Sequence, residues 1–383
     1  MMPGMANRWV ALALVFVTRS SMGFQFQAVA SVTPLMIADL HLSYAQVGWL
    51  IGIYMLPGML LAFPGGVIGQ RFGERRLVLL GLALMVAGTV VTATASSFAM
   101  AAAGRVMSGV GAVLMNILLP KLIADWFEGK EIATAMAVVL TSWPVGLGLA
   151  TATLGGLAAA TSWRTALLAT AALAGVGFVL MLLFREAPRT STPVRARLGA
   201  RDVRLGVAGG FAWGCFNASL VTIIAFGPGL LIARGMALGE AGYVVSLAIW
   251  LTMISVPLGG LLSDKLGRPT LVIVLGSLVA AGATLLLPTW SHAVLAFTIV
   301  GLAVGPPPGP LMALVPRAVA PERVTSTYGV FYTVFYLMMA LTQPLAGLVR
   351  DRAGDPAAPI VFAAIVMVAT VVGLGLFRRL ERA

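Results

Sequence analysis

Two arginines of this sequence lie inside long apolar segments, where a charged side chain is costly. Arg19 stands about ten residues into the apolar run that begins at Trp9, which is roughly 15 Å of helix. Arg105 lies roughly 10 Å into the run that begins at Phe98. A lone charge at the bilayer centre costs about 2.5–3.5 kcal/mol on insertion scales, and residues of this kind generally serve function. Arg19 is therefore the first candidate for a binding group.

The sequence offers these arginines no buried counter-ion. All 13 Asp and Glu residues fall in expected loops or at helix ends, and so do His41 and His292. A buried unpaired charge is expensive, whereas an anion arriving from water could pair with it. The planar guanidinium suits carboxylate, nitrate-like or phosphate oxygens. Because no nucleophile–base set or metal-ligand cluster is present either, we expect neither an enzyme nor a bound cofactor or metal.

Other polar and aromatic residues occur at helical spacing around these arginines. Phe26 and Gln27 share the helix face of Arg19. A stripe from Tyr328 to Tyr336 would find no hydrogen-bond partners in lipid, which favours a cavity lining over ordinary helix packing. The expected substrate-binding residues are Arg19, Phe26, Gln27, Tyr54, Arg105, Asn116, Trp143, Asn217, Trp250, Tyr332, Tyr336 and Gln343.

Twelve apolar runs must position these side chains. Hydrophobic residues make up 60% of the 383 residues and charged residues 10%, and about 20 apolar residues span a bilayer. The sequence therefore predicts an all-α membrane protein with twelve transmembrane helices and almost nothing left for a soluble domain. The runs are Trp9–Met36, Tyr44–Gly69, Leu77–Ala95, Phe98–Ala124, Ile132–Ala159, Thr165–Phe184, Leu205–Ile232, Ala241–Ser263, Thr270–Pro288, Ala293–Pro316, Val324–Val349 and Pro359–Phe377.

One run contains its own interruption. Consecutive prolines between Gly305 and Pro310 remove backbone donors and clash with the preceding helical turn. The tenth helix is therefore predicted to break or kink there. Broken helices mark binding sites or hinges in transporters, and a kink tolerated near the helix end is the alternative.

Two glycine-rich basic loops divide the chain into similar halves. The loop at 65–76 is echoed at 259–269, with a period of 194 residues between Gln70 and Asp264. This is too long for a solenoid repeat. The halves are expected at 1–184 and 205–383, joined by a basic linker at 185–204.

The pattern Gly-x-x-x-Asp-Arg/Lys-x-Gly-x-Arg in these loops resembles the signature of the major facilitator superfamily. The first copy departs from it, with Gln70 where the family has Asp. The segment from Arg105 to Gly111 resembles a second family signature, in which the arginine often has a structural or coupling role. The resemblance implies two six-helix halves related by pseudo-symmetry, and it places Asp264 near the start of helix 5, around Ile132–Thr134. It implies gating roles for Gln70, Arg71, Asp264 and Arg268.

The distribution of positive charge predicts the orientation. The net charge is +12, but 19 of the 25 Lys and Arg residues fall in segments on one side of the expected helices and four on the other. The positive-inside rule then places both termini in the cytoplasm, and we expect the inner membrane of a bacterium. This bias argues against a nucleic-acid partner. The single Cys215 excludes an internal disulfide.

The sequence thus favours a secondary transporter that moves a small anion, an organic carboxylate or a nitrate- or cyanate-like ion, by alternating access. Exchange, or symport without a buried carboxylate as proton carrier, is the expected mechanism. The expected partners are this anion and the lipid bilayer, and we expect a monomer. A proton-driven efflux antiporter for drugs or metabolites is the alternative, although it would usually need a buried Asp or Glu. A transport-inactive membrane sensor is a further alternative.

Overall fold

The computed structural model describes residues 7–62, 69, 71–127, 131–186 and 198–382, and helices form nearly all of this part. Twelve helical segments in it are long and apolar enough to cross a membrane, which confirms the predicted number of spans. The N-terminal half contains α1 (Arg8–Ser31), α2 (Thr33–Leu40), α3 (Tyr44–Gly52), α4 (Pro57–Leu61), α6 (Glu74–Ala93), α7 (Phe98–Trp126), α8 (Ile132–Ala160) and α9 (Trp163–Leu183).

The first helix of the C-terminal half starts at Ala200, five residues before the apolar run that begins at Leu205. There the Asp202 carboxylate accepts a hydrogen bond from the Gly199 backbone N–H and pairs with Arg323 at 2.8 Å. The helices of this half are α10 (Ala200–Ile232), α11 (Leu238–Leu266), α12 (Pro269–Leu286), α13 (Ala293–Ala303), α14 (Pro308–Met312), α15 (Leu314–Ala318), α16 (Pro321–Ala353) and α17 (Ala358–Arg382).

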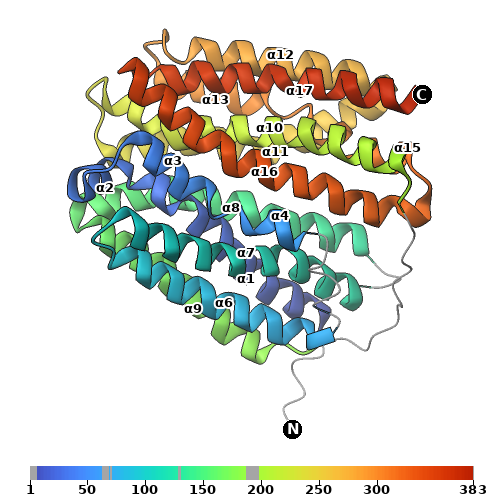
Figure 1. Cartoon of the computed structure of the whole chain (residues 1–383), viewed down its shortest axis with the longest axis horizontal. Coiled ribbons are helices and arrows are strands. Elements are labelled where there is room, and N and C mark those ends of the chain that lie inside the picture. The colour runs from blue at the N-terminus through green and yellow to red at the C-terminus, as the bar shows by residue number, and fades with distance from the viewer. Residues whose placement is uncertain (1–6, 63–68, 70, 128–130, 187–197, 383) are drawn as a thin grey trace.

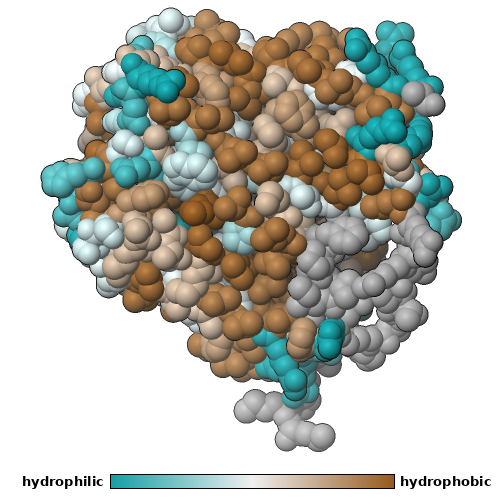
Figure 2. Space-filling model, in the orientation of Figure 1, coloured by the Kyte–Doolittle hydropathy of each residue, from teal (hydrophilic) through white to brown (hydrophobic). Residues whose placement is uncertain are grey.

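Figure 1 shows the two halves as two layers of helices that run roughly side by side, with the N-terminal half below and the C-terminal half above. We call the end at which Phe184 and Ala200 lie the linker end, and the opposite end, with α2 and the start of α3, the far end. Figure 2 shows that the face in view is largely hydrophobic, with most of the strongly hydrophilic residues at its margins. Exposed apolar side chains such as Ile365 and Val372 of α17 belong to this surface, as expected for a protein whose sides face lipid.

The expected break in the tenth span is confirmed. Helix α13 ends at Ala303, and α14 begins only at Pro308. The intervening segment packs closely on α11, where a Cβ on Gly259 would lie 2.4 Å from the Pro306 Cα.

The first two spans are also interrupted, which the sequence analysis did not anticipate. Helix α1 ends at Ser31, and the chain restarts as α2 with Pro34 near its beginning. Helix α3 ends at Gly52, and α4 restarts at Pro57. A proline cannot donate to the carbonyl four residues earlier, and its ring clashes with the preceding turn. The expected single runs Trp9–Met36 and Tyr44–Gly69 are therefore broken helices in their described parts.

Two seams of small residues join the halves near the far end. In the seam between α3 and α16, a Cβ on Gly48 would lie 2.3 Å from the Gln343 carbonyl oxygen, and one on Gly347 would lie 2.1 Å from the Tyr44 oxygen. In the seam between α8 and α11, a Cβ on Gly242 would lie 2.4 Å from the Thr151 oxygen. Only glycine lets the two backbones approach this closely. The two halves are therefore in close backbone contact at the far end.

Candidate functional site

The Arg19 guanidinium lies where α1, α7 and α8 meet. It is only 5% exposed. Its Nη1 donates to the Val139 carbonyl oxygen at 3.0 Å and to the Ser142 hydroxyl at 3.1 Å, and its Nη2 donates to Asn116 Oδ1 at 2.8 Å. All three acceptors are neutral, and no carboxylate pairs with Arg19 in the described part of the chain. The charge is therefore solvated by dipoles but not neutralised.

Arg19 retains hydrogen-bonding capacity. A guanidinium has five N–H donors, and three of them are used. Its Nε is buried without a hydrogen-bond partner, and Nε lies on the same edge of the guanidinium as Nη2. Carboxylates bind along such an edge through two parallel hydrogen bonds. Since Asn116 is half-buried, it is the partner of Nη2 that a ligand could displace.

Asn116 connects Arg19 to the other half of the molecule. Its Oδ1 accepts from Arg19, so its Nδ2 is left to donate to the Tyr336 hydroxyl on α16, at 2.8 Å. The Tyr336 O–H proton then remains available to a further acceptor. Asn116 is thus hydrogen-bonded to both halves while part of its surface stays exposed. The chain from Arg19 through Asn116 to Tyr336 thus brings together predicted residues from both halves.

Several predicted aromatic residues and a second free donor lie on the helices that carry this chain or pack against it. The Phe26 ring is 5.4 Å from Trp143 and 5.7 Å from Tyr54 between centroids. Tyr332 stacks obliquely on Tyr336 at 6.5 Å. Gln27 is 1% exposed, and its Nε2 has no hydrogen-bond partner among the described residues. An unpaired buried donor costs about 1–3 kcal/mol, so the interior favours a ligand that accepts hydrogen bonds.

Arg105 has a different environment. It is 2% exposed, and it donates to three backbone carbonyls, those of Leu50 at 2.8 Å, Gln25 at 3.1 Å and Phe26 at 3.2 Å. Its guanidinium also stacks over the Tyr54 ring at 4.3 Å. The Leu50 carbonyl belongs to the last turn of α3, where the break in the span leaves carbonyls without helical donors. Arg105 therefore ties α7 to α1 and to the broken second span.

We expect Arg105→Lys to lower stability more than it lowers ligand affinity. Lysine cannot reach three carbonyls with a planar fork, and each buried acceptor left unpaired costs about 1–3 kcal/mol. Thermal unfolding of the purified variant should show a clear fall in Tm, while anion binding to the folded fraction stays within a few-fold of wild type. A selective loss of binding at unchanged Tm would instead place Arg105 in the ligand site.

The remaining predicted site residues lie in packing positions or at partly exposed places. Gln343 is fully buried and joins α16 to α10, because its Nε2 donates to the Ala218 carbonyl at 3.2 Å and its Oε1 accepts from Thr222 at 3.3 Å.

Three other predicted residues make contacts away from Arg19. Asn217 is half-buried and donates to the Trp213 carbonyl of its own helix at 2.8 Å. The Tyr54 hydroxyl donates to Gln25 Oε1 at 3.2 Å. Trp250 packs on Gly148 in the seam between α8 and α11.

The expected gating contact is not made in this conformation. The Asp264 carboxylate is exposed and has no hydrogen bond or ion pair with any described residue. Helix α8, its expected partner, begins at Ile132 without a side-chain cap. Arg71 and Arg268 are exposed as well, and the Arg71 guanidinium lies over the Phe72 ring. Gln70 lies outside the described residues, so its role stays a prediction.

We therefore expect Asp264 to act in the alternative conformation, when the linker end closes. A carboxylate at a helix N-terminus contributes about 0.3–1 kcal/mol when exposed. Asp264→Asn should remove this stabilisation of the alternative conformation. The population of the conformation described here should then rise by about two- to fivefold, and Gln70→Ala should have a smaller effect. Accessibility of cysteines introduced between the halves measures the populations. Equal populations in both variants and wild type would contradict a gating role.

Two parts of the site have no signature in the sequence. Ser142 and the Val139 carbonyl accept hydrogen bonds from Arg19, although they lie on α8, more than a hundred residues later in the sequence. Nothing in the spacing of Ser142 distinguishes it from the other small polar residues of that span. At the far end, the Asp351 carboxylate accepts hydrogen bonds from the backbone N–H groups of Tyr44 at 2.9 Å and Ala45 at 2.8 Å. It thereby caps α3 from the opposite half of the molecule.

Twelve spans in two packed halves, with a buried cationic group that Asn116 links to the second half, define a membrane transporter that works by alternating access. The sequence profile of the Major Facilitator Superfamily matches residues 15–342, and the chain belongs to this family.

Two curated relatives resemble much of the chain. It is 25% identical to the uncharacterized transporter YycB of Bacillus subtilis (strain 168) over 386 aligned positions, covering 96% of this chain and 93% of the relative. It is 27% identical to the 3-(3-hydroxy-phenyl)propionate transporter of Escherichia coli (strain K12), covering 71% and 70%.

Solved structures share the fold at low sequence identity. A bacterial homologue of the human lysosomal transporter Spinster, in an inward-facing and occupied conformation, matches with a TM-score of 0.76 at 18% identity, over 98% of this chain and 96% of that one. A mutant of the nucleoside transporter NupG matches with a TM-score of 0.79 at 13% identity, over 97% and 99%. These matches confirm the predicted transporter fold.

Proposed function

We propose that the transported substrate is a small anion that binds Arg19 between the two halves. One observation carries this proposal: a buried guanidinium has only neutral partners and an unpaired Nε–H. Leaving a buried cation without a counter-ion is expensive. An anion entering from water would neutralise the charge, and the protein would recover part of that cost as binding free energy.

Within this class, an organic carboxylate with an apolar or aromatic body fits the surroundings best. The rings of Phe26 on α1, Trp143 on α8 and Tyr332 on α16 offer flat apolar surface on the helices around Arg19. The free donors on Arg19, Gln27 and Tyr336 suit carboxylate and hydroxyl oxygens. The Escherichia coli relative is named for an aryl carboxylate, which agrees with this choice. Nitrate- or cyanate-like ions remain the simpler members of the proposed class.

The conformation supports a binding site that is alternately exposed to the two sides. The seams and the Asp351 contact hold the far end closed, while Asp264 at the linker end is unengaged. We infer that the linker end is cytoplasmic, in the inner membrane of a bacterium, because the expected positive-charge surplus lies there. Since the site lacks a buried carboxylate, we expect exchange, or symport in which no such group carries the proton.

Counterflow in proteoliposomes tests the proposed function. Purified protein would be reconstituted with unlabelled 3-phenylpropionate inside, and uptake of the labelled anion would be compared with nitrate, cyanate and the neutral 3-phenylpropanol. Saturable exchange of an anion without exchange of the alcohol is the expected result. Absence of counterflow for every anion, together with proton-driven extrusion of a cationic dye, would favour the alternative of an efflux antiporter.

A topology experiment tests the inferred orientation. A reporter fused after Phe184 or at Ala383 should report a cytoplasmic location, because positively charged segments are retained on that side. A reporter fused after His41, at the far end, should give the opposite signal. A periplasmic signal at Phe184 or Ala383 would contradict the inferred orientation.

A further inference from the structure

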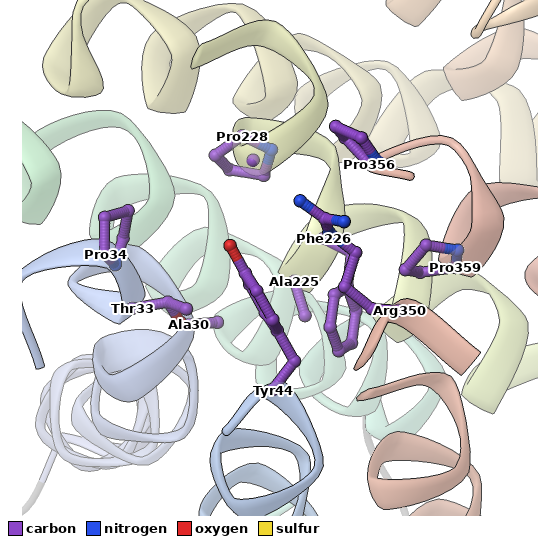
Figure 3. A pocket seen from close by; sticks show the side chains of 11 residues that line it. Ala30, Thr33, Pro34, Tyr44, Ala225, Phe226, Pro228, Arg350, Pro356 and Pro359 are labelled. Atoms are coloured by element: carbon purple, nitrogen blue, oxygen red, sulfur yellow. The ribbon is translucent and has the colours of Figure 1, made fainter. Parts of the chain in front are cut away.

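A pocket at the far end lies between the two halves, away from Arg19. Residues of α1, α2 and α3 form one side of it, and residues of α10, α16 and the start of α17 form the other. Figure 3 shows Tyr44 and Arg350 extending side by side into the pocket, with Pro34 across from Pro228 and Pro359. The pocket therefore has apolar walls and one cationic side chain.

The Arg350 guanidinium forms no direct ion pair within the described part of the chain. It lies over the Tyr44 ring at 4.8 Å, and it has no hydrogen bond or ion pair with any described residue. The neighbouring carboxylates are already engaged, because Asp351 binds the start of α3 and Asp355 accepts from the Ala357 backbone N–H at 2.8 Å. The Tyr44 hydroxyl also has no hydrogen-bond partner among the described residues. A planar fork of donors and a phenol thus face the same pocket.

We propose that this pocket is a second anion site, which binds a small aryl carboxylate at the far end of the transport path. The carboxylate would form a bidentate pair with Arg350 and accept a hydrogen bond from Tyr44. The free volume of the pocket, about 40 Å³, is less than a benzene ring needs, so the carboxylate would enter the pocket and part of its flat body would extend beyond it past Phe226 and the prolines. Apolar walls strengthen such a pair, because they exclude water and lower the local dielectric. This goes beyond the site at Arg19 and does not depend on whether Arg19 binds the same anion.

Gly229 offers a reporter position for this site. It lines the pocket, and a Cβ added there would meet nothing within 4 Å. The natural Cys215 is buried and can be replaced by Ala. In detergent, the purified Cys215→Ala/Gly229→Cys protein would be coupled to uncharged N-ethylmaleimide at constant ionic strength. Benzoate is the probe, and benzyl alcohol is its neutral control of similar shape.

We expect benzoate to slow the coupling and benzyl alcohol to have little effect. Arg350→Gln should raise the half-protecting benzoate concentration at least about tenfold, since charge-assisted hydrogen bonds are roughly twice as strong as neutral ones. Arg350→Lys should lie between Arg350→Gln and the parent protein, because it keeps the charge and loses the fork. Arg352→Gln is the matched control, since Arg352 is exposed, lies two positions away and does not line the pocket.

The Arg19→Gln background separates the two sites. If the pocket binds benzoate itself, protection persists in Arg19→Gln and disappears in Arg350→Gln. Protection lost in Arg19→Gln but kept in Arg350→Gln would show that benzoate acts from the central site, and would overturn the proposal. Equal protection by benzyl alcohol, or no protection by benzoate at all, would overturn it as well. A normal anion affinity of Arg19→Gln would count only against the proposed function.

Discussion

Arg19→Gln should abolish anion transport while the protein stays folded. Glutamine keeps a hydrogen bond within reach of Asn116 or Ser142 but removes the charge and the planar fork. Truncating one partner of a buried charge pair costs about 2–5 kcal/mol of binding free energy, or roughly 30-fold to several thousand-fold in affinity. The fold should tolerate the change, because it removes a buried cation that has no counter-ion. Ligand binding by calorimetry and Tm of the purified variant measure the two effects.

Two further variants sharpen this test. Arg19→Lys keeps the charge but loses bidentate geometry, so its affinity should fall strongly and still exceed that of Arg19→Gln. Arg76→Gln removes the same charge from an exposed position at the linker end and should bind normally. Wild-type affinity in Arg19→Gln would place the substrate site elsewhere. A collapsed fold without a specific loss of binding would make Arg19 a structural residue.

Asp351→Ala should open the far end. The two hydrogen bonds from Asp351 to Tyr44 and Ala45 can form only when α16 lies against the start of α3, so their loss destabilises only the closed conformation. Removing a helix cap of this kind costs about 0.5–2 kcal/mol. The ratio of open to closed protein should therefore rise by about two- to thirtyfold. Spin labels on cysteines at positions 41 and 352, one in each half, would report the distance distribution.

Asp355→Ala is the matched control for this prediction. Asp355 is also an exposed far-end carboxylate, but its hydrogen bond to the Ala357 N–H stays within the C-terminal half. It should leave the distance distribution unchanged. An unchanged distribution in Asp351→Ala would mean that the glycine seams alone hold the far end closed.

The spans were predictable because backbone polar groups in lipid must be satisfied within a helix, which leaves a long apolar run in the sequence. The break after Ala303 was predictable for a similar reason, since consecutive prolines cannot continue a helix. The break at Pro57 was missed, although it has the same cause, because a single proline is often tolerated in a span. Pro144 lies within α8 without ending it. Sequence alone does not say which of these prolines interrupts a span.

The candidate site was predictable only in part. The depth of Arg19 and the lack of buried acids follow from composition and helix geometry. Its partners depend on how α1, α7 and α8 pack, so Ser142 could not be chosen over its neighbours. Gln343 shares a helical stripe with Tyr336, yet it turns toward α10 and serves packing. The contact of Asp351 with α3 joins positions about 300 residues apart, and no local pattern encodes it.

The seams also affect how readily the two halves can separate at the far end. Interlocked side chains would have to leave their rotamers before two helices separate, and they would expose apolar surface to water when they did. At Gly48, Gly242 and Gly347 the contacts are instead between a glycine and a carbonyl oxygen of the opposite helix. At these positions, separation of the helices exchanges a weak C–H contact of the oxygen for water and moves no side chain out of its rotamer. The closed end can thus be tightly shut and still open over a low barrier, as repeated transport cycles require.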